Sequence, residues 1–130
     1  MVIQYPKGMF ARLSDHLHLS DFECRCVRPD CLVTYLDEEL VESVEVAWVK
    51  ASGLIIDSGF RCTAHNAKIG GRPGSLHLSG KAADMKPKKL SIPEFLIVVQ
   101  NIPRFKDGGI GVYKTFIHAD VRGGRARWTG

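Results

Sequence analysis

The stretch Leu76-His-Leu-Ser-Gly-Lys-Ala-Ala-Asp-Met85 decides the fold around which the rest of the chain is arranged. The Ser-Gly pair at its middle is typical of a tight turn between two short arms, so we predict a β-hairpin here. Six residues separate His77 from Asp84, and across such a hairpin both side chains would point to one spot. An imidazole nitrogen and a carboxylate oxygen are both good zinc ligands. The stretch therefore predicts part of a metal site.

A second hairpin, near the end of the chain, supplies a third candidate ligand. Its predicted arms are residues 109–113 and 116–121, two short runs rich in residues that favour strands. Side chains alternate along a strand, so His118 and Asp120 share a face. Two histidines and one aspartate would leave a fourth coordination position open for water, as in catalytic zinc sites. From spacing alone, the alternative is a hairpin with one ordinary histidine and an aspartate bonded to its turn.

Capping residues and apolar spacing predict three helices. Asp37 is a good N-cap for the longest of them. Its buried stripe is predicted to consist of Leu40, Val41, Val44, Ala47, Trp48 and Ala51. S-x-x-E capping boxes begin at Ser20 and at Ser91, and they predict a short helical turn and a helix that runs to about Gln100.

Strands and helices alternate without the regular βαβ order of a parallel sheet. Residues 54–61 predict a strand that runs into a loop, and residues 66–76, rich in glycine and proline, predict a loop. This arrangement favours an α+β fold with a mainly antiparallel sheet and flanking helices.

Length and composition limit the possible classes of protein. The chain has 130 residues, of which 45% are hydrophobic and 25% are charged, which fits a single globular domain over residues 1–130. The longest apolar run, Phe95–Val99, is far shorter than the roughly 20 residues of a membrane span. The first residues lack the basic and then apolar pattern of a secretory signal. We therefore expect a chain that is made in the cytoplasm and has no membrane span.

Charge is unevenly distributed along the chain. Residues 1–65 hold six Lys and Arg against ten Asp and Glu, whereas residues 66–130 hold twelve against four. The resulting net charges of −4 and +8 suggest a basic face and a polyanionic neighbour, and the alternative is a generally solvated surface. The sequence has no basic helix at major-groove spacing and no aromatic ribonucleoprotein motif. We expect no nucleic-acid partner.

Four cysteines leave three states open. They are Cys24, Cys26, Cys31 and Cys62. The spacing C-x-C-x4-C does not match the paired C-x2-C knuckles of common zinc folds. Two disulfides, a structural metal site and free buried thiols are therefore alternatives, and we expect a structural role in each case.

Several of these segments together resemble the zinc D-Ala-D-Ala peptidase family. The resemblance covers Ser58-Gly-Phe-Arg-Cys-Thr-Ala-His-Asn66, Gly70-Gly71 and the stretch from Gly74 to Asp84. The family motif S-x-H-x-x-G-x-A-x-D is filled here by Ser75, His77, Gly80, Ala82 and Asp84. The opening Leu19–Cys24 and the closing residues 108–128 resemble the small single-domain branch found in phage and bacterial genomes.

The resemblance implies the α+β fold shared with the hedgehog signalling domain, and it implies roles for individual residues. The implied ligands of one zinc ion are His77, Asp84 and His118. Arg61 matches the arginine that binds the substrate and stabilises its developing negative charge. Ser75 matches a polar residue that borders the substrate, and Asn66 is a further candidate for substrate contact.

One position departs from the family pattern. Many relatives have an acidic general base three residues before the last histidine ligand, where this chain has Thr115. No Asp or Glu occurs between Asp107 and Asp120, so Asp120, on the face of His118, is the candidate general base. Its alternative role is that of a carboxylate that orients a histidine.

The resemblance implies hydrolysis of peptidoglycan stem peptides next to D-alanine, by a carboxypeptidase or an endopeptidase route, through a zinc-activated water. The alternative is a non-catalytic, zinc-stabilised module that binds the cell wall or a protein, because fold alone does not fix function. We expect one catalytic zinc ion, with a second, structural ion at the cysteines as an alternative. We also expect a monomer that reaches the wall through holin-type release or in a phage particle.

Overall fold

The computed structural model describes residues 1–130 and contains seven strands and five α-helices. The strands are β1 (Val2–Pro6), β2 (Val33–Asp37), β3 (Leu54–Ser58), β4 (Ala82–Pro87), β5 (Gly109–Val112), β6 (Ile117–Asp120) and β7 (Ala126–Thr129). The helices are α1 (Leu19–Phe22), α2 (Glu38–Ala51), α3 (Thr63–Lys68), α4 (Ile92–Gln100) and α5 (Pro103–Lys106). A 3₁₀ helix, Leu76–Ser79, precedes β4.

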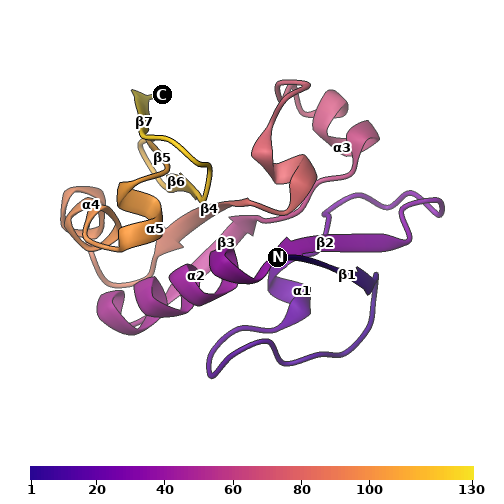
Figure 1. The fold of residues 1–130 in the computed structure, drawn as a ribbon, viewed down its shortest axis with the longest axis horizontal. Coiled ribbons are helices and arrows are strands. Elements are labelled where there is room, and N and C mark those ends of the chain that lie inside the picture. Colours follow the sequence, from indigo (N-terminus) through magenta and orange to yellow (C-terminus); the bar gives the residue numbers. More distant parts are fainter.

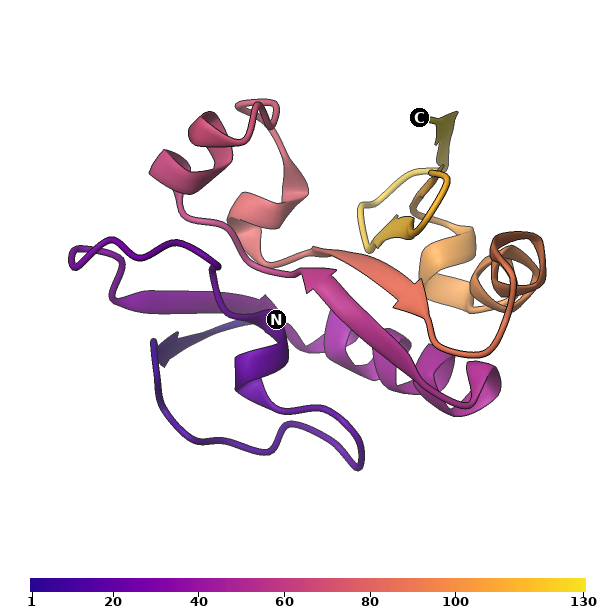
Figure 2. The same cartoon turned by 180° about the vertical axis from the view of Figure 1, so that it is seen from behind.

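The strands form two sheets. The larger sheet has the order β3-β4-β6-β5-β7, and β1 pairs with β2 in a separate two-stranded sheet. Every pairing is antiparallel except that of β5 with β7. The predicted α+β class with a mainly antiparallel sheet is therefore confirmed. Figures 1 and 2 show α4 and α5 at one end of the larger sheet, and α3 and the β1–β2 pair at the other.

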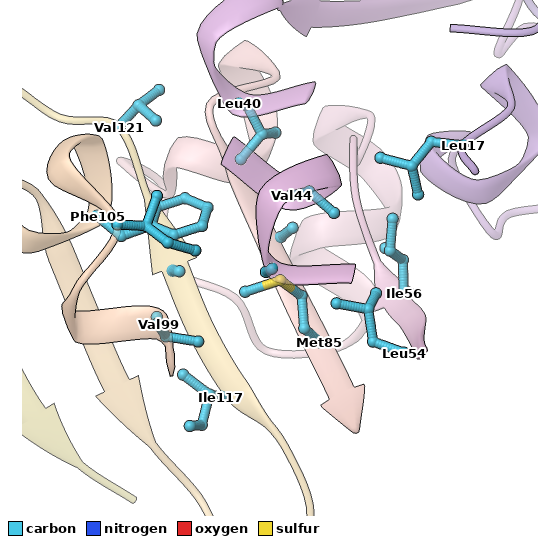
Figure 3. Packing of buried hydrophobic residues seen from close by; sticks show 14 of the residues in the cluster. Leu17, Leu40, Val44, Leu54, Ile56, Met85, Val99, Phe105, Ile117 and Val121 are labelled. Carbon is cyan, nitrogen blue, oxygen red and sulfur yellow. The ribbon is translucent and has the colours of Figure 1, made fainter. Parts of the chain in front are cut away.

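One face of the larger sheet packs against α2, α4 and α5, and the main hydrophobic core lies between them (Figure 3). Strands β4 and β6 contribute the fully buried residues Ala83, Met85, Ile117 and Ala119 to this core. Side chains alternate between the faces of a strand, so Asp84, His118 and Asp120 lie on the opposite face. The strands that complete the core thus also present polar side chains to the other side of the sheet.

Two predicted helices are confirmed together with their caps. Asp37 Oδ1 accepts the Glu39 N–H at 2.9 Å and begins α2, which ends at Ser52 in the left-handed conformation (φ 56°). The Ser91 hydroxyl accepts the Glu94 N–H at 3.3 Å, and the Glu94 carboxylate accepts the Ser91 N–H at 2.9 Å. Each such cap contributes about 1 kcal/mol because it satisfies N–H groups that have no partner within the helix.

The short helix α1 is confirmed, but its predicted cap is wrong. The N-cap is His18, whose N–H donates to Asp21 at 2.8 Å, so Ser20 and Glu23 do not form the capping box. The helix begins before Ser20 because Leu19, which is completely buried, belongs to its first turn. Core packing therefore overrides the local capping signal.

The predicted hairpin around Gly80 is wrong in its first arm. Leu76–Ser79 forms the 3₁₀ helix, and only the second arm is a strand. Ser75 begins this helix by accepting the His77 N–H at 3.2 Å. Gly80 ends it with φ 72°, at a place where a Cβ atom would collide with the Tyr35 carbonyl group. Glycine is required here both by the backbone conformation and by the close approach of β2.

The remaining predicted elements agree with the structure only in part. Residues 66–68 belong to α3, so the predicted loop 66–76 begins inside a helix. The second hairpin, β5 with β6, is confirmed. Strands β1, β2 and β7 were not predicted, because each is short and gains its stability from a partner distant in sequence. No helix in the structure is both long enough and apolar enough to cross a membrane.

Candidate metal centre

Strand register brings two of the predicted ligands side by side. Asp84 in β4 pairs directly with His118 in β6, and His118 Nδ1 lies 3.0 Å from Asp84 Oδ1. His77, in the 3₁₀ helix that leads into β4, turns its Nε2 to the same carboxylate oxygen at 3.2 Å. The three side chains therefore converge, although the 3₁₀ helix replaces the expected first arm of the hairpin.

The spacing of these donor atoms fits a small divalent cation. One ligand atom from each of the three residues lies within 4.8 Å of the other two. Tetrahedral zinc with ligands at about 2.0–2.1 Å separates its donors by about 3.3 Å, close to the 3.0 and 3.2 Å found here. Two imidazoles and one carboxylate are three of the four ligands that tetrahedral zinc takes, so one position would stay free.

Hydrogen-bond chemistry also points to a cation at this place. His77 Nδ1 lies 2.7 Å from the Gly59 carbonyl oxygen, which only accepts, so the N–H of a neutral His77 is on Nδ1. Its Nε2 lone pair then faces an oxygen of Asp84, and two acceptors in contact repel each other. A proton or a metal ion between them removes this repulsion.

The same contacts govern the ionisation of the cluster. Burial raises the pKa of Asp84, but hydrogen bonds with His118 and His77 and their charges outweigh it and hold that pKa well below its usual range. Burial lowers the pKa of His118, yet the carboxylates of Asp120 and Asp84 raise it above its ordinary value overall. Asp84 is therefore a carboxylate, the form that coordinates metal ions.

Asp120 contacts the other ring nitrogen of His118. It is completely buried, and its Oδ2 lies 2.8 Å from His118 Nε2. Arg122 donates to both carboxylate oxygens at 2.9 Å, and the Gly109 N–H donates to Oδ1 at 2.9 Å. Both oxygens are thus engaged by groups of the protein. This geometry favours the alternative role of Asp120, which is to orient the histidine ring, over that of general base.

Arg61 reaches the cluster from the loop after β3. Its Nη2 donates to Asp84 Oδ2 at 3.2 Å, its Nε to the Ser58 hydroxyl at 3.0 Å and its Nη1 to Asn66 Oδ1 at 3.2 Å. These contacts use three of the five guanidinium N–H groups, so two remain for another acceptor. The Arg61 side chain is 13% exposed and lines a surface cleft, so part of it reaches solvent.

The other two predicted site residues hold the loops around the cluster. Asn66 is buried (3% exposed), and its amide donates to the Arg72 carbonyl at 2.8 Å while its oxygen accepts from Arg61. Asn66 therefore supports the Arg61 side chain and links it to the loop at Arg72. The Ser75 hydroxyl accepts the His77 N–H and is partly exposed, so it lies next to a ligand and within reach of solvent.

Two groups that contact the cluster were not predicted from the sequence. The Gly59 carbonyl fixes the tautomer of His77, and no residue pattern indicates such a contact because every residue has a backbone carbonyl. Arg122 anchors Asp120, and here a signal exists: His118, Asp120 and Arg122 alternate along one strand and its extension, which places them on one face.

An aromatic side chain and a cleft border the cluster. The Trp128 ring, from β7, lies 5.1 Å from the His118 ring, and its indole N–H donates to the Tyr113 hydroxyl at 3.0 Å. A surface cleft is lined by Tyr35, Phe60, Arg61 and Leu78, so Arg61 belongs both to the cluster and to the wall of this cleft. Thr115, at the position of the expected acid, is exposed and lies outside β6.

A comparison with protein families identifies one match. The family model described as Peptidase M15 matches residues 11–120, which is most of the chain. The matched region includes every residue of the candidate metal centre described above except Arg122 and Trp128, and it excludes β1 and β7. No curated protein matches the chain in a sequence search.

Proposed function

Because the chain belongs to the Peptidase M15 family, we propose that it is a zinc metallopeptidase that hydrolyses peptidoglycan stem peptides next to D-alanine. The observation that carries the proposal is the convergence of His77, Asp84 and His118 on one point, a set of three protein ligands where tetrahedral zinc takes four. A closed structural site would use four protein ligands, so a set of three supports a catalytic ion.

Each residue of the cluster would contribute to binding the ion through a specific atom. His77 would bind through Nε2 because its Nδ1–H is fixed by the Gly59 carbonyl, and Asp84 would bind through Oδ1. Asp120 would keep the His118 ring in place from the opposite ring nitrogen. When bound, zinc lowers the pKa of a coordinated water towards about 7 and polarises the carbonyl that is attacked.

Arg61 would bind the substrate with its two free N–H groups. A guanidinium stays charged at any working pH and can hold a carboxylate, or an oxygen that becomes negative, through two hydrogen bonds. Its contacts with Ser58, Asn66 and Asp84 fix the direction of these donors before the substrate arrives. Such preorganised donors lower a barrier by about 3 kcal/mol each.

Digestion of purified muropeptides, followed by mass spectrometry, tests the proposal. A carboxypeptidase would remove a single terminal alanine from pentapeptide stems, and an endopeptidase would convert cross-linked dimers to monomers. The His77→Ala variant is the control, because it should lose both the metal and the cleavage. Absence of both products with the zinc-loaded protein would contradict the proposal.

A second candidate, a non-catalytic zinc-stabilised module that binds the wall, is favoured by one observation. The position three residues before His118 holds Thr115, which cannot act as a general base, and Asp120 is fully engaged. Zinc binding together with sedimentation on peptidoglycan, but without cleavage of any wall fragment, would identify this function.

A further inference from the structure

The four cysteines gather at one place although they come from distant parts of the chain. Cys24 and Cys26 follow α1, Cys31 precedes β2, and Cys62 is the N-cap of α3. The four sulfur atoms all lie within 4.8 Å of one another, and none of them is in a disulfide. Loop closure brings together segments separated by more than 30 residues, so this convergence is a property of the fold and not of the local sequence.

The distances match a tetrahedron of sulfur ligands. Zinc binds cysteine sulfur at about 2.3 Å, which separates two sulfurs of a tetrahedral site by about 3.8 Å. The Sγ atoms of Cys26 and Cys62 are 3.9 Å apart. Two disulfides would join the sulfurs as two separate pairs and would not require all four to approach one another. The arrangement therefore fits four ligands around one centre better than two pairs.

Hydrogen-bond donors surround these sulfurs. The Cys62 N–H points to Cys24 Sγ at 3.3 Å, and the His65 N–H points to Cys62 Sγ at 3.4 Å. The Lys7 ammonium lies 3.5 Å from Cys26 Sγ. Donors of this kind stabilise thiolates, and a cation beside them offsets the negative charge that four thiolates leave on a divalent ion.

We propose that Cys24, Cys26, Cys31 and Cys62 bind a second zinc ion in a closed, structural site. Cys24 and Cys31 are buried (4% and 9% exposed) and pack against Phe60, whereas Cys26 and Cys62 are partly exposed, and Cys31 and Cys62 also line the surface cleft at Arg61. Four protein ligands complete the coordination of zinc, which distinguishes this site from the open one at His77, Asp84 and His118.

The site would act as a tether for the loop that carries Arg61. Residues 23–32 contain no helix or strand, so backbone hydrogen bonds of regular elements do not hold them in place. Cys62 directly follows Arg61, and a metal between it and residues 24–31 would fix both segments to each other. This inference does not depend on the proposed peptidase activity, because it concerns ligands that take no part in it.

Cobalt substitution tests the proposal directly. The reduced chain is made metal-free and loaded with Co²⁺, and absorption is recorded together with metal content. Sulfur-to-cobalt charge-transfer bands in the near ultraviolet are expected, and they report thiolate ligation only, because His77, Asp84 and His118 contain no sulfur. In the His77→Ala/His118→Ala variant, one equivalent of metal and the same bands should remain.

Two substitutions at one position provide the matched control. Cys26 is partly exposed, so it tolerates replacement better than its buried partners. Cys26→His keeps a ligand and should retain one equivalent of metal at this site, whereas Cys26→Ser should lose it. Absence of the charge-transfer bands from the unsubstituted, reduced chain would overturn the proposal even where a variant fails to fold. Thiol titration in denaturant of the protein as purified, before any reduction, would then distinguish free thiols from disulfides.

Discussion

The two clusters of metal-ligand side chains are positioned by different means. Asp84 and His118 stand on adjacent strands whose register is fixed by backbone hydrogen bonds and by the core beneath them. Three of the four cysteines lie in a segment without regular structure. Rigid strands can thus hold an incomplete set of metal ligands in place for chemistry, whereas a complete set of ligands can itself hold loops in place.

The largest effect is expected from His77→Ala, which should abolish hydrolysis and leave the cysteine cluster unchanged. His77→Ala removes a proposed ligand of the open site, so muropeptide hydrolysis should fall by about 10³-fold or more, since the metal would supply several kcal/mol of transition-state stabilisation. The metal content should fall by one equivalent and not by two. Loss of all bound metal would show that the two clusters are not independent.

Substitution of Arg61 should have the next largest effect. Arg61→Ala removes donors aimed at developing charge, and kcat should fall by about 10²–10³-fold. Arg61→Lys is the control, because it keeps the charge without the planar fork and should recover only part of the rate. Metal content should stay unchanged in both variants. A rate equal to that of the unsubstituted protein in Arg61→Ala would exclude Arg61 from the reaction.

Asp120→Asn distinguishes the two roles considered for this carboxylate. If Asp120 orients His118, zinc affinity should fall by about 10–100-fold, and saturating zinc should restore most of the hydrolysis. If Asp120 is the general base, affinity should hold and the rate should stay low at any zinc concentration. Metal titration and kinetics on one preparation decide between them. We expect the first result, because both oxygens of Asp120 already accept hydrogen bonds.

A carboxylate–histidine pair at the surface, in which Glu45 is half-buried, should show the smallest effect and serves as a reference for both clusters. Glu45 Oε2 lies 2.7 Å from His16 Nδ1, and the Ser14 hydroxyl also donates to Glu45. Burial raises the pKa of Glu45, but these hydrogen bonds and the charge of His16 lower it below its ordinary value overall. A lowered folded-state pKa adds stability above the unfolded value, and this stability is lost as the pH falls through the folded value.

Glu45→Gln should therefore lower the free energy of unfolding by less than about 1 kcal/mol at neutral pH, and by less still in acid. Denaturant unfolding of both proteins, once at neutral pH and once at a pH below the folded-state pKa of Glu45, measures this difference. Metal content and hydrolysis should not change. A change in metal content or in hydrolysis would contradict this expectation, because neither His16 nor Glu45 contacts a residue of the two clusters.

Local patterns predicted the elements that are stabilised locally. The caps at Asp37 and Ser91 and the β5–β6 hairpin depend on residues a few positions apart, and all three are confirmed. The pairing of β1 with β2 and of β5 with β7 joins distant segments, and no local pattern predicts it. The first arm of the hairpin was wrong because Ser75 caps a 3₁₀ helix there.

The candidate site divides in the same way. The motif from Ser75 to Asp84 identified two ligands within ten residues, and strand alternation placed Asp120 on the face of His118. The direct pairing of Asp84 with His118 follows from strand order, which the sequence does not state. The convergence of the cysteines depends on loop closure over 31 residues between Cys31 and Cys62, so spacing alone could not choose among three alternatives.

Reconstitution of the metal-free protein tests the central claim most directly. Zinc is added in steps to the apoprotein and to its His118→Ala variant, and the release of alanine or of monomeric muropeptides is measured at each step. We predict that hydrolysis is absent without zinc, appears as the His77, Asp84 and His118 site fills, and never appears in the variant. Hydrolysis at the full rate by protein shown to be metal-free would contradict this prediction.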